Sequence, residues 1–138
     1  QLTLSQKVSM SGAIVVTTPQ DIALIDAKKG IEMFRKVNVP ILGIIENMST
    51  HICSACGNQD SIFGSLGGEK LAFEYGVRLL AELPLDTCIR TQADTGVPIV
   101  MSHPESVAAQ RFQSSVSKMS ELLDEDMGST AEIKISES

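Results

Sequence analysis

Two cysteines, Cys53 and Cys56, are separated by two residues and followed directly by Gly57. At this spacing both sulfur atoms can face one soft metal centre, which prefers thiolate ligands. Such a pair is compatible with half of a zinc site, a redox-active dithiol or half of an iron–sulfur cluster site. The redox interpretation is the weakest, because a reactive dithiol usually begins a helix that lowers the thiol pKa. This pair instead lies among the Ser, Asn, Gln and Gly residues of a polar loop.

The number of available ligands limits how the cysteine pair could hold zinc or an iron–sulfur cluster. Zinc sites and four-iron clusters each take four protein ligands, and the chain offers one close pair plus Cys88. We interpret Cys88 as an ordinary half-buried cysteine, and His51 as a possible third ligand that could equally be exposed to solvent. A two-fold axis places the same patch of two chains face to face, so two pairs would supply four thiolates. The pattern favours a cluster shared by a homodimer, with a zinc clip that orders the loop as the alternative.

The composition limits the partners and the compartment. The chain has 138 residues, is 43% hydrophobic and carries a net charge of −6, which fits one globular domain and argues against nucleic acid or an anionic membrane as the main partner. No apolar run approaches the roughly 20 residues of a membrane span. Three cysteines do not make a secreted disulfide framework, so we expect the cytoplasm. Because the chain begins at Gln1, in what resembles the middle of a helix, we expect it to be part of a larger protein.

Short apolar runs alternate with helical patterns along the chain. Continuous β-branched runs are typical of strands buried on both faces of a parallel sheet, and the strand–helix alternation implies right-handed crossovers. We therefore predict an α/β fold with a partial doubly wound parallel sheet. Residues 124–138 are acidic and rich in small residues, so they are predicted to form a disordered tail. The expected strands are Gly12–Thr18, Ile41–Asn47 and Arg78–Leu83. The first expected helix begins after an N-cap at Thr18, and further helices are expected over Gly67–Tyr75, Asp86–Asp94 and about Glu105–Leu123.

Candidate binding residues follow two of these strands. In open parallel sheets, ligands bind beyond the carboxyl ends of the strands, and the cysteine pair lies in a long loop there. Asn47 ends its strand, and its amide could match the N6 and N7 edge of adenine or simply begin a turn. Pro84 and Asp86 follow the next strand and could flank a base or form a turn. The 138 residues contain no Gly-x-x-x-x-Gly-Lys-Ser/Thr phosphate loop.

Seven blocks of sequence carry a family resemblance. They are Gln1–Leu4, Val15–Asp26, Gly43–Ser49, Cys53–Gly57, Ile62–Gly64, Leu83–Leu85 and Asp94–Val100. In this order and spacing, over residues 1–123, they resemble the Mrp (ApbC-like) iron–sulfur cluster carrier ATPases. That family belongs to the deviant P-loop group, which includes MinD and the nitrogenase iron protein. Residues 1–123 would then be the C-terminal portion of a P-loop NTPase domain.

The resemblance implies a cytoplasmic homodimer that binds a labile 4Fe–4S cluster between subunits and passes it to apoproteins. Cys53 and Cys56 match the family's cluster cysteines, Asn47 matches the residue that reads adenine, and the segment of Pro84 and Asp86 matches the one beside the base. The family's phosphate loop and acidic switch segments would lie upstream of Gln1. We therefore expect ATP and Mg²⁺ to act in the complete protein, and we assign no catalytic residue within this chain. The alternatives are a structural zinc module and an ATPase or partitioning-type enzyme in which the cysteines are structural.

Overall fold

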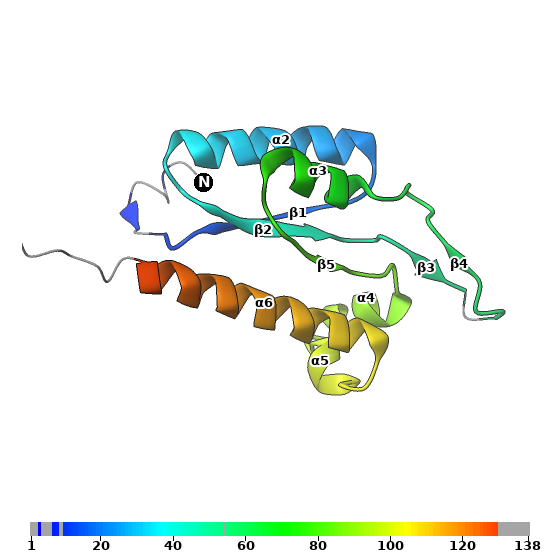
Figure 1. The fold of residues 1–138 in the computed structure, drawn as a ribbon. Helices are drawn as coiled ribbons and strands as arrows, with labels where there is room; N and C mark the ends of the chain where they lie inside the picture. Colours follow the sequence, from blue (N-terminus) through cyan, green and yellow to red (C-terminus); the bar gives the residue numbers. More distant parts are fainter. Residues whose placement is uncertain (1–2, 4–6, 9, 54, 130–138) are drawn as a thin grey trace, which may run out of the picture.

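A three-stranded parallel sheet lies at the centre of the fold, with its strands in the order β1–β2–β5 (Figure 1). A computed structural model describes residues 3, 7–8, 10–53 and 55–129, with side chains up to residue 125. Helices α2 and α3 cover one face of the sheet, and α6 covers part of the other, with α4 and α5 beside it (Figure 1). The described elements are β1 (Ala13–Thr17), α2 (Asp21–Lys36), β2 (Ile41–Glu46), β3 (His51–Ile52), β4 (Gln59–Asp60), α3 (Gly67–Tyr75), β5 (Leu79–Glu82), α4 (Thr87–Asp94), α5 (Ile99–Ser102) and α6 (Val107–Ser129).

The pairing of the strands confirms the predicted α/β architecture. β2 is parallel to β1 on one side and to β5 on the other, and helices lie on both faces of the sheet. The core fills the space between the sheet and helices α2 and α3, where Ile31, Ile44 and Leu71 are almost completely buried. Burial of these side chains contributes roughly 1.5–3 kcal/mol each to folding. This cluster of apolar side chains thus joins α2 and α3 to the sheet.

One strand differs from its prediction. The run Gly12–Thr18 was expected to be buried on both faces, yet Val16 of β1 is 59% exposed. Ala13, Val15 and Thr17 point the other way and are buried, because side chains alternate along a strand. The prediction is therefore wrong for one face of β1. The physical reason is that α6 packs mainly on β5 and β2.

The structure also places the ends of two helices differently from the sequence-based prediction. Gln20, not Thr18, is the N-cap of α2, and Thr18 Oγ1 donates to Gln20 Oε1 at 3.2 Å. The tail predicted from Asp124 is wrong for its first residues, since α6 continues to Ser129. Arg78 and Glu125 form an ion pair at 3.4 Å on this extension. The remaining residues of the predicted tail, 130–138, lie outside the described part of the chain.

Helix α3 begins against a carboxylate from the neighbouring strand. Leu66, its N-cap, supplies no side-chain hydrogen bond, and the buried Glu46 at the end of β2 accepts the backbone N–H of Gly68 instead. A Cβ atom at Gly68 would lie 2.9 Å from the Cβ of Glu46, so only glycine permits this close approach. The first N–H groups of a helix need an acceptor, and a carboxylate there is also favoured by the helix dipole. Glu46 therefore joins the sheet to α3.

The two outer strands of the sheet differ in what bonds their free edges. Along β5, Arg111 Nη1 donates to the carbonyl of Glu82 at 2.6 Å and Lys118 Nζ to that of Leu80 at 2.9 Å. Both donors come from α6, which blunts that strand as an edge for further pairing. β1 pairs only with β2 among the described strands.

None of the helices in the described part of the chain is long and apolar enough to cross a membrane.

We predict that Glu46→Ala lowers the free energy of unfolding by about 1–3 kcal/mol, because it leaves the buried N–H of Gly68 without an acceptor. Glu46→Gln retains a carbonyl acceptor and should lose much less. Glu82→Ala is the matched control, since it removes an exposed carboxylate at the end of the adjoining strand. Urea unfolding followed by circular dichroism measures all three variants. Equal losses for Glu46→Ala and Glu82→Ala would contradict the role assigned to Glu46.

Candidate functional site

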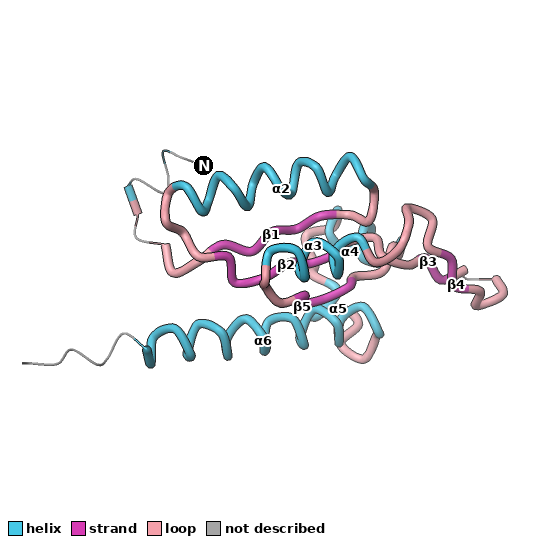
Figure 2. Tube along the Cα trace, turned by 45° about the horizontal axis from the view of Figure 1, so that its top comes forward, coloured by secondary structure: helices cyan, strands magenta, loops and turns pink. Residues whose placement is uncertain are grey.

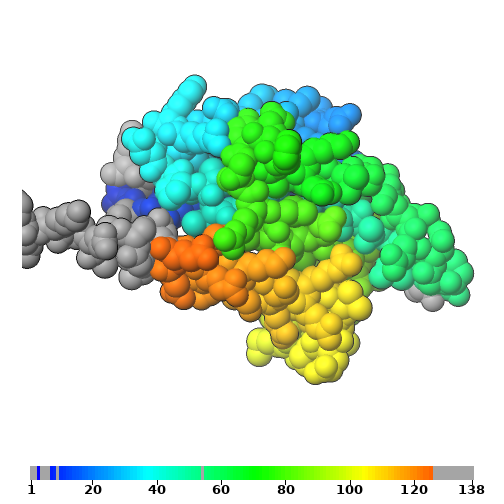
Figure 3. All heavy atoms as spheres, viewed as in Figure 1, coloured from blue at the N-terminus to red at the C-terminus, as the bar shows by residue number. Residues whose placement is uncertain are grey.

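The two cysteines lie in the turn of a short antiparallel arm. β3 and β4 pair over two residues each, His51 with Asp60 and Ile52 with Gln59, and the arm projects from the end of the sheet where the parallel strands finish (Figures 1 and 2). The space-filling view shows this arm standing out from the body of the molecule (Figure 3). Cys53 is half-buried, Cys56 is exposed, and neither forms a disulfide. Both thiols are thus presented at a surface.

The backbone of the turn stabilises a thiolate at Cys53. The Cys53 N–H donates to the carbonyl of Asn58 at 2.9 Å, and the Gly57 N–H returns to the carbonyl of Cys53 at 2.8 Å. Gly57 has φ of +70°, a left-handed conformation that glycine adopts without strain. The backbone amides of Cys56 and Ala55, followed by the thiol of Cys56, lower the pKa of Cys53. A lowered thiol pKa suits a metal ligand and a redox-active thiol alike. The position of the pair in a loop, instead of at the start of a helix, is therefore no longer an argument against the redox interpretation.

The arm offers two ligands and no more in the described structure. No group of three His, Cys, Asp or Glu side chains comes close enough to hold a metal ion among the described residues. His51 Nδ1 lies 3.2 Å from the carbonyl oxygen of Leu85; since that oxygen can only accept, Nδ1 carries the proton of this bond. Cys88 lies in the first turn of α4, with its sulfur 3.9 Å from His103 Nδ1. The assignment of Cys53 and Cys56 as ligands, and of Cys88 as a non-ligand, stays a prediction.

The three residues predicted for nucleotide binding lie at the same end of the sheet, but they do not form one cluster. Pro84 and Asp86 help to line a cleft of about 370 Å³ at the base of the arm, together with His51 and Ser106. Asn47 is half-buried at the end of β2 and does not line this cleft. The roles of Asn47, Pro84 and Asp86 in binding a base therefore stay predictions.

Two of these side chains already have local partners. Asn47 Oδ1 accepts the N–H of Met48 at 3.0 Å, which is the turn role weighed against adenine recognition. Asp86 is the N-cap of α4 and accepts the N–H of Cys88 at 2.7 Å. A cap of this kind stabilises a helix by about 1 kcal/mol. Asp86 thus has a structural function whatever else it binds.

The sequence did not reveal how the arm is fastened to the sheet. Five hydrogen bonds link the residues that follow β2 to those that follow β5, and we call residues 46–51 and 83–85 the junction. The bonds join Leu83 N to Glu46 O (2.8 Å), Ser49 N and Oγ to Leu83 O (2.9 and 3.1 Å), Leu85 N to Thr50 O (2.8 Å) and His51 Nδ1 to Leu85 O (3.2 Å). Four of them involve backbone N–H groups or a short hydroxyl, which leave no distinctive pattern of residue types. The junction extends the parallel pairing of β2 and β5 as far as the cysteine arm.

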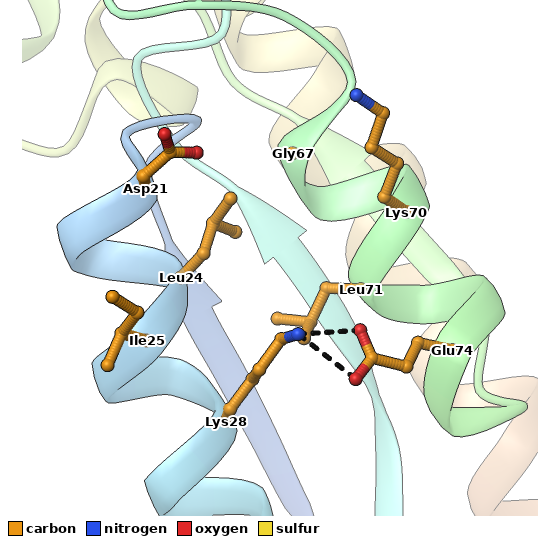
Figure 4. Close-up of a pocket in the computed structure, with 8 residues that line it drawn as sticks. All are labelled: Asp21, Leu24, Ile25, Lys28, Gly67, Lys70, Leu71 and Glu74. Carbon is orange, nitrogen blue, oxygen red and sulfur yellow. Dashed lines mark hydrogen bonds and ion pairs between the residues drawn. The ribbon is translucent and has the colours of Figure 1, made fainter.

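A second groove lies elsewhere on the molecule, between α2 and α3 (Figure 4). It has a volume of about 400 Å³ and is crossed by an ion pair of 2.7 Å between Lys28 and Glu74. The Glu74 carboxylate raises the pKa of Lys28, although a pair this exposed to solvent contributes little to stability. Gly67 lets the helices approach, since a Cβ there would lie 2.9 Å from Leu24 Cδ1. None of the predicted site residues lines this groove.

Comparison with known proteins identifies the family of this chain. Residues 1–120 match a family described as NUBPL iron-transfer P-loop NTPase, of the ParA type. The iron–sulfur cluster carrier protein of Pseudomonas fragi is 58% identical over 113 residues, which are 82% of this chain and 39% of that protein. The protein of the same name from Escherichia coli K12 is 61% identical over 106 residues, or 77% of this chain and 29% of the relative. The chain thus spans about a third of the length of these relatives.

Solved structures support the fold. The septum site-determining protein MinD from Pyrococcus horikoshii, complexed with Mg-ADP, superposes with a TM-score of 0.62 at 32% sequence identity. The match covers 89% of this chain and 45% of that one. The partial P-loop NTPase fold expected from the sequence is therefore confirmed.

We predict that Cys53 of the folded chain is alkylated by iodoacetamide at lower pH than the same cysteine in urea, because a lowered pKa places the reactive thiolate at lower pH. Peptide mass spectrometry across a pH series measures the midpoint for each cysteine. Cys56→Ser removes one thiol contact but keeps both amides, so it should reverse only part of the shift. Identical midpoints in the folded and unfolded chain would show that the amides do not stabilise the thiolate.

Proposed function

Because the chain belongs to the NUBPL iron-transfer family of P-loop NTPases, we propose that it is the cluster-holding part of an iron–sulfur cluster carrier. In this proposal Cys53 and Cys56 bind a labile 4Fe–4S cluster as cargo, and the protein passes it to apoproteins. The observation that carries the proposal is the exposed turn in which two backbone amides stabilise the Cys53 thiolate. A thiolate is the form of cysteine that binds iron.

The position of the arm supports a shared site. One arm supplies two thiolates, whereas a 4Fe–4S cluster takes four, so two copies related by a two-fold axis would complete the coordination. The tip of the arm projects from the body (Figure 3), which lets two such turns approach one another. A cluster held between two surfaces would also be accessible for transfer when the subunits separate. The proposed partners are a second copy of the chain and apo iron–sulfur proteins, in the cytoplasm.

We propose that ATP, with Mg²⁺, acts in the complete protein rather than in these 138 residues alone. The relatives are about three times longer than the matched segment, and the sequence has no phosphate loop. Asn47, Pro84 and Asp86 are proposed to contact the base of the nucleotide. Support comes from their location beyond the carboxyl ends of β2 and β5, where parallel sheets bind ligands.

A structural zinc site is the second candidate, because the same turn would suit zinc. Zinc takes thiolates at a similar spacing and also needs four ligands. Anaerobic reconstitution followed by iron and sulfide analysis and a visible absorption spectrum separates the two. A bound cluster gives iron, sulfide and visible colour, whereas zinc gives none of them.

We predict that Cys53→Ala and Cys56→Ala each abolish cluster binding, whereas Cys88→Ala, the matched control, leaves it largely intact. Each of the first two changes removes two of the four thiolates from a symmetric dimer. Loading should also drive dimerisation, since binding to the dimer alone shifts the equilibrium by mass action. Iron and sulfide per chain, with size-exclusion chromatography before and after loading, provide the measurement. A full cluster on a monomer, or loss of iron from Cys88→Ala alone, would refute the shared site.

We predict that the isolated chain does not hydrolyse ATP. Phosphoryl transfer needs backbone amides, a lysine and a metal ion around the phosphates, and the sequence offers no such loop. Phosphate release by the purified chain should stay at the level of a buffer control. Turnover that disappears when a residue within the chain is changed would place a catalytic site here after all.

A further inference from the structure

One carboxylate lies on the same face of the arm as Cys53. His51 pairs with Asp60 across the two strands, and the bond from the Cys53 N–H to the carbonyl of Asn58 continues this register by two residues. Side chains directly opposite one another on antiparallel strands share a face, and so do those two positions further along each strand. Asp60 is therefore the diagonal neighbour of Cys53, a relation that separates residues by roughly 7–8 Å.

The carboxylate of Asp60 has a defined position and keeps its charge. Asn58 Nδ2 donates to Asp60 Oδ2 at 2.9 Å, which holds the carboxylate beside the cysteine turn. In the part of the chain that the structure describes, none of the ion pairs includes Asp60. The arm thus places a negative charge without a cationic partner next to the thiol that we propose as a cluster ligand.

Asp60 acts against the groups that favour a thiolate at Cys53. The backbone amides of Cys56 and Ala55 lower the pKa of Cys53, whereas burial and the negative charge of Asp60 raise it. The same repulsion applies to a bound cluster, because four thiolates outweigh the positive charge of a 4Fe–4S core, and net charge is one of the factors that tune such clusters. A symmetric dimer would bring two of these carboxylates to one cluster.

Resting on the proposed function, we infer that Asp60 is the residue that keeps the cargo labile. Its charge weakens the hold of the Cys53 thiolate on the cluster, so that the arm binds the cluster loosely enough to release it. Asp60 acts on the cluster through Cys53 and is not itself a ligand. The amides of the turn and this carboxylate would together set the strength of binding.

Transfer of iron from the reconstituted 138-residue chain to a ferrous chelator tests this role. We expect Asp60→Asn to slow iron loss about 2- to 3-fold at low ionic strength, the size of one Coulomb interaction at this spacing in water. Asp60→Glu keeps the charge and should lose iron at the rate of the unmodified chain. Asp26→Asn is the matched control, since it removes an exposed carboxylate from α2, and it should change nothing.

The dependence on salt distinguishes a charge effect from a structural one. Salt screens interactions between exposed charges, so the difference between Asp60→Asn and the unmodified chain should shrink as salt is raised. Equal rates of iron loss at low salt, faster loss from Asp60→Asn, or a difference that high salt leaves intact would each overturn the role of Asp60. Circular dichroism checks that every variant is folded.

A second readout needs no cluster and separates this role from the proposed function. In the apo chain, Asp60→Asn should move the midpoint of Cys53 alkylation by iodoacetamide to lower pH, because it removes a charge that raises the pKa of Cys53. Asp26→Asn should leave that midpoint in place. If the midpoint moves but reconstitution gives no iron–sulfur absorbance, the proposed function fails and the role in cargo release fails with it. If the cluster forms and the midpoint does not move, the role of Asp60 alone is overturned.

Discussion

Hydrogen bonding of β2 on both sides places every candidate functional residue of this protein. β1 and β5 run parallel to it, so all three strands finish at the same end of the sheet. Past Glu46 the pairing continues through the junction, where Leu83 and Leu85 bond the chain that leads to the cysteine turn. If β2 did not pair with β5, the cysteine arm would have no fixed base.

Glu46 illustrates how a polar group within an apolar strand can be structural. Its carboxylate accepts a backbone N–H at the start of α3, which ties the helix covering one face to the central strand. The same strand then leads into the arm, which carries the proposed cluster ligands. A buried residue secures the scaffold and an exposed turn presents the thiolates, and this division suits a site that must be rigid at its base yet accessible at its tip.

Two of the corrections to the sequence-based prediction share one cause. Val16 was expected to be buried, and Asp124 was expected to begin a tail, but both depend on the path of α6. That helix crosses β5 and β2, where Lys118 and Arg111 bond strand carbonyls, and it continues beyond the apolar stripe that predicted it. Local sequence patterns do not predict the direction in which a helix crosses a sheet.

The sequence by itself determined the three strands of the parallel sheet, the main helices and the pair of thiols, because these follow from apolar periodicity, β-branched runs and the two-residue spacing of Cys53 and Cys56. Short blocks of the sequence also indicated its resemblance to a family of cluster carriers. Only the tertiary structure decided which face of β1 is covered, what caps α3 and how the arm is fastened. Those features rest on contacts between residues far apart in the chain, such as Glu46 with Gly68 and His51 with Leu85, and local sequence patterns do not indicate which distant backbone group a side chain reaches.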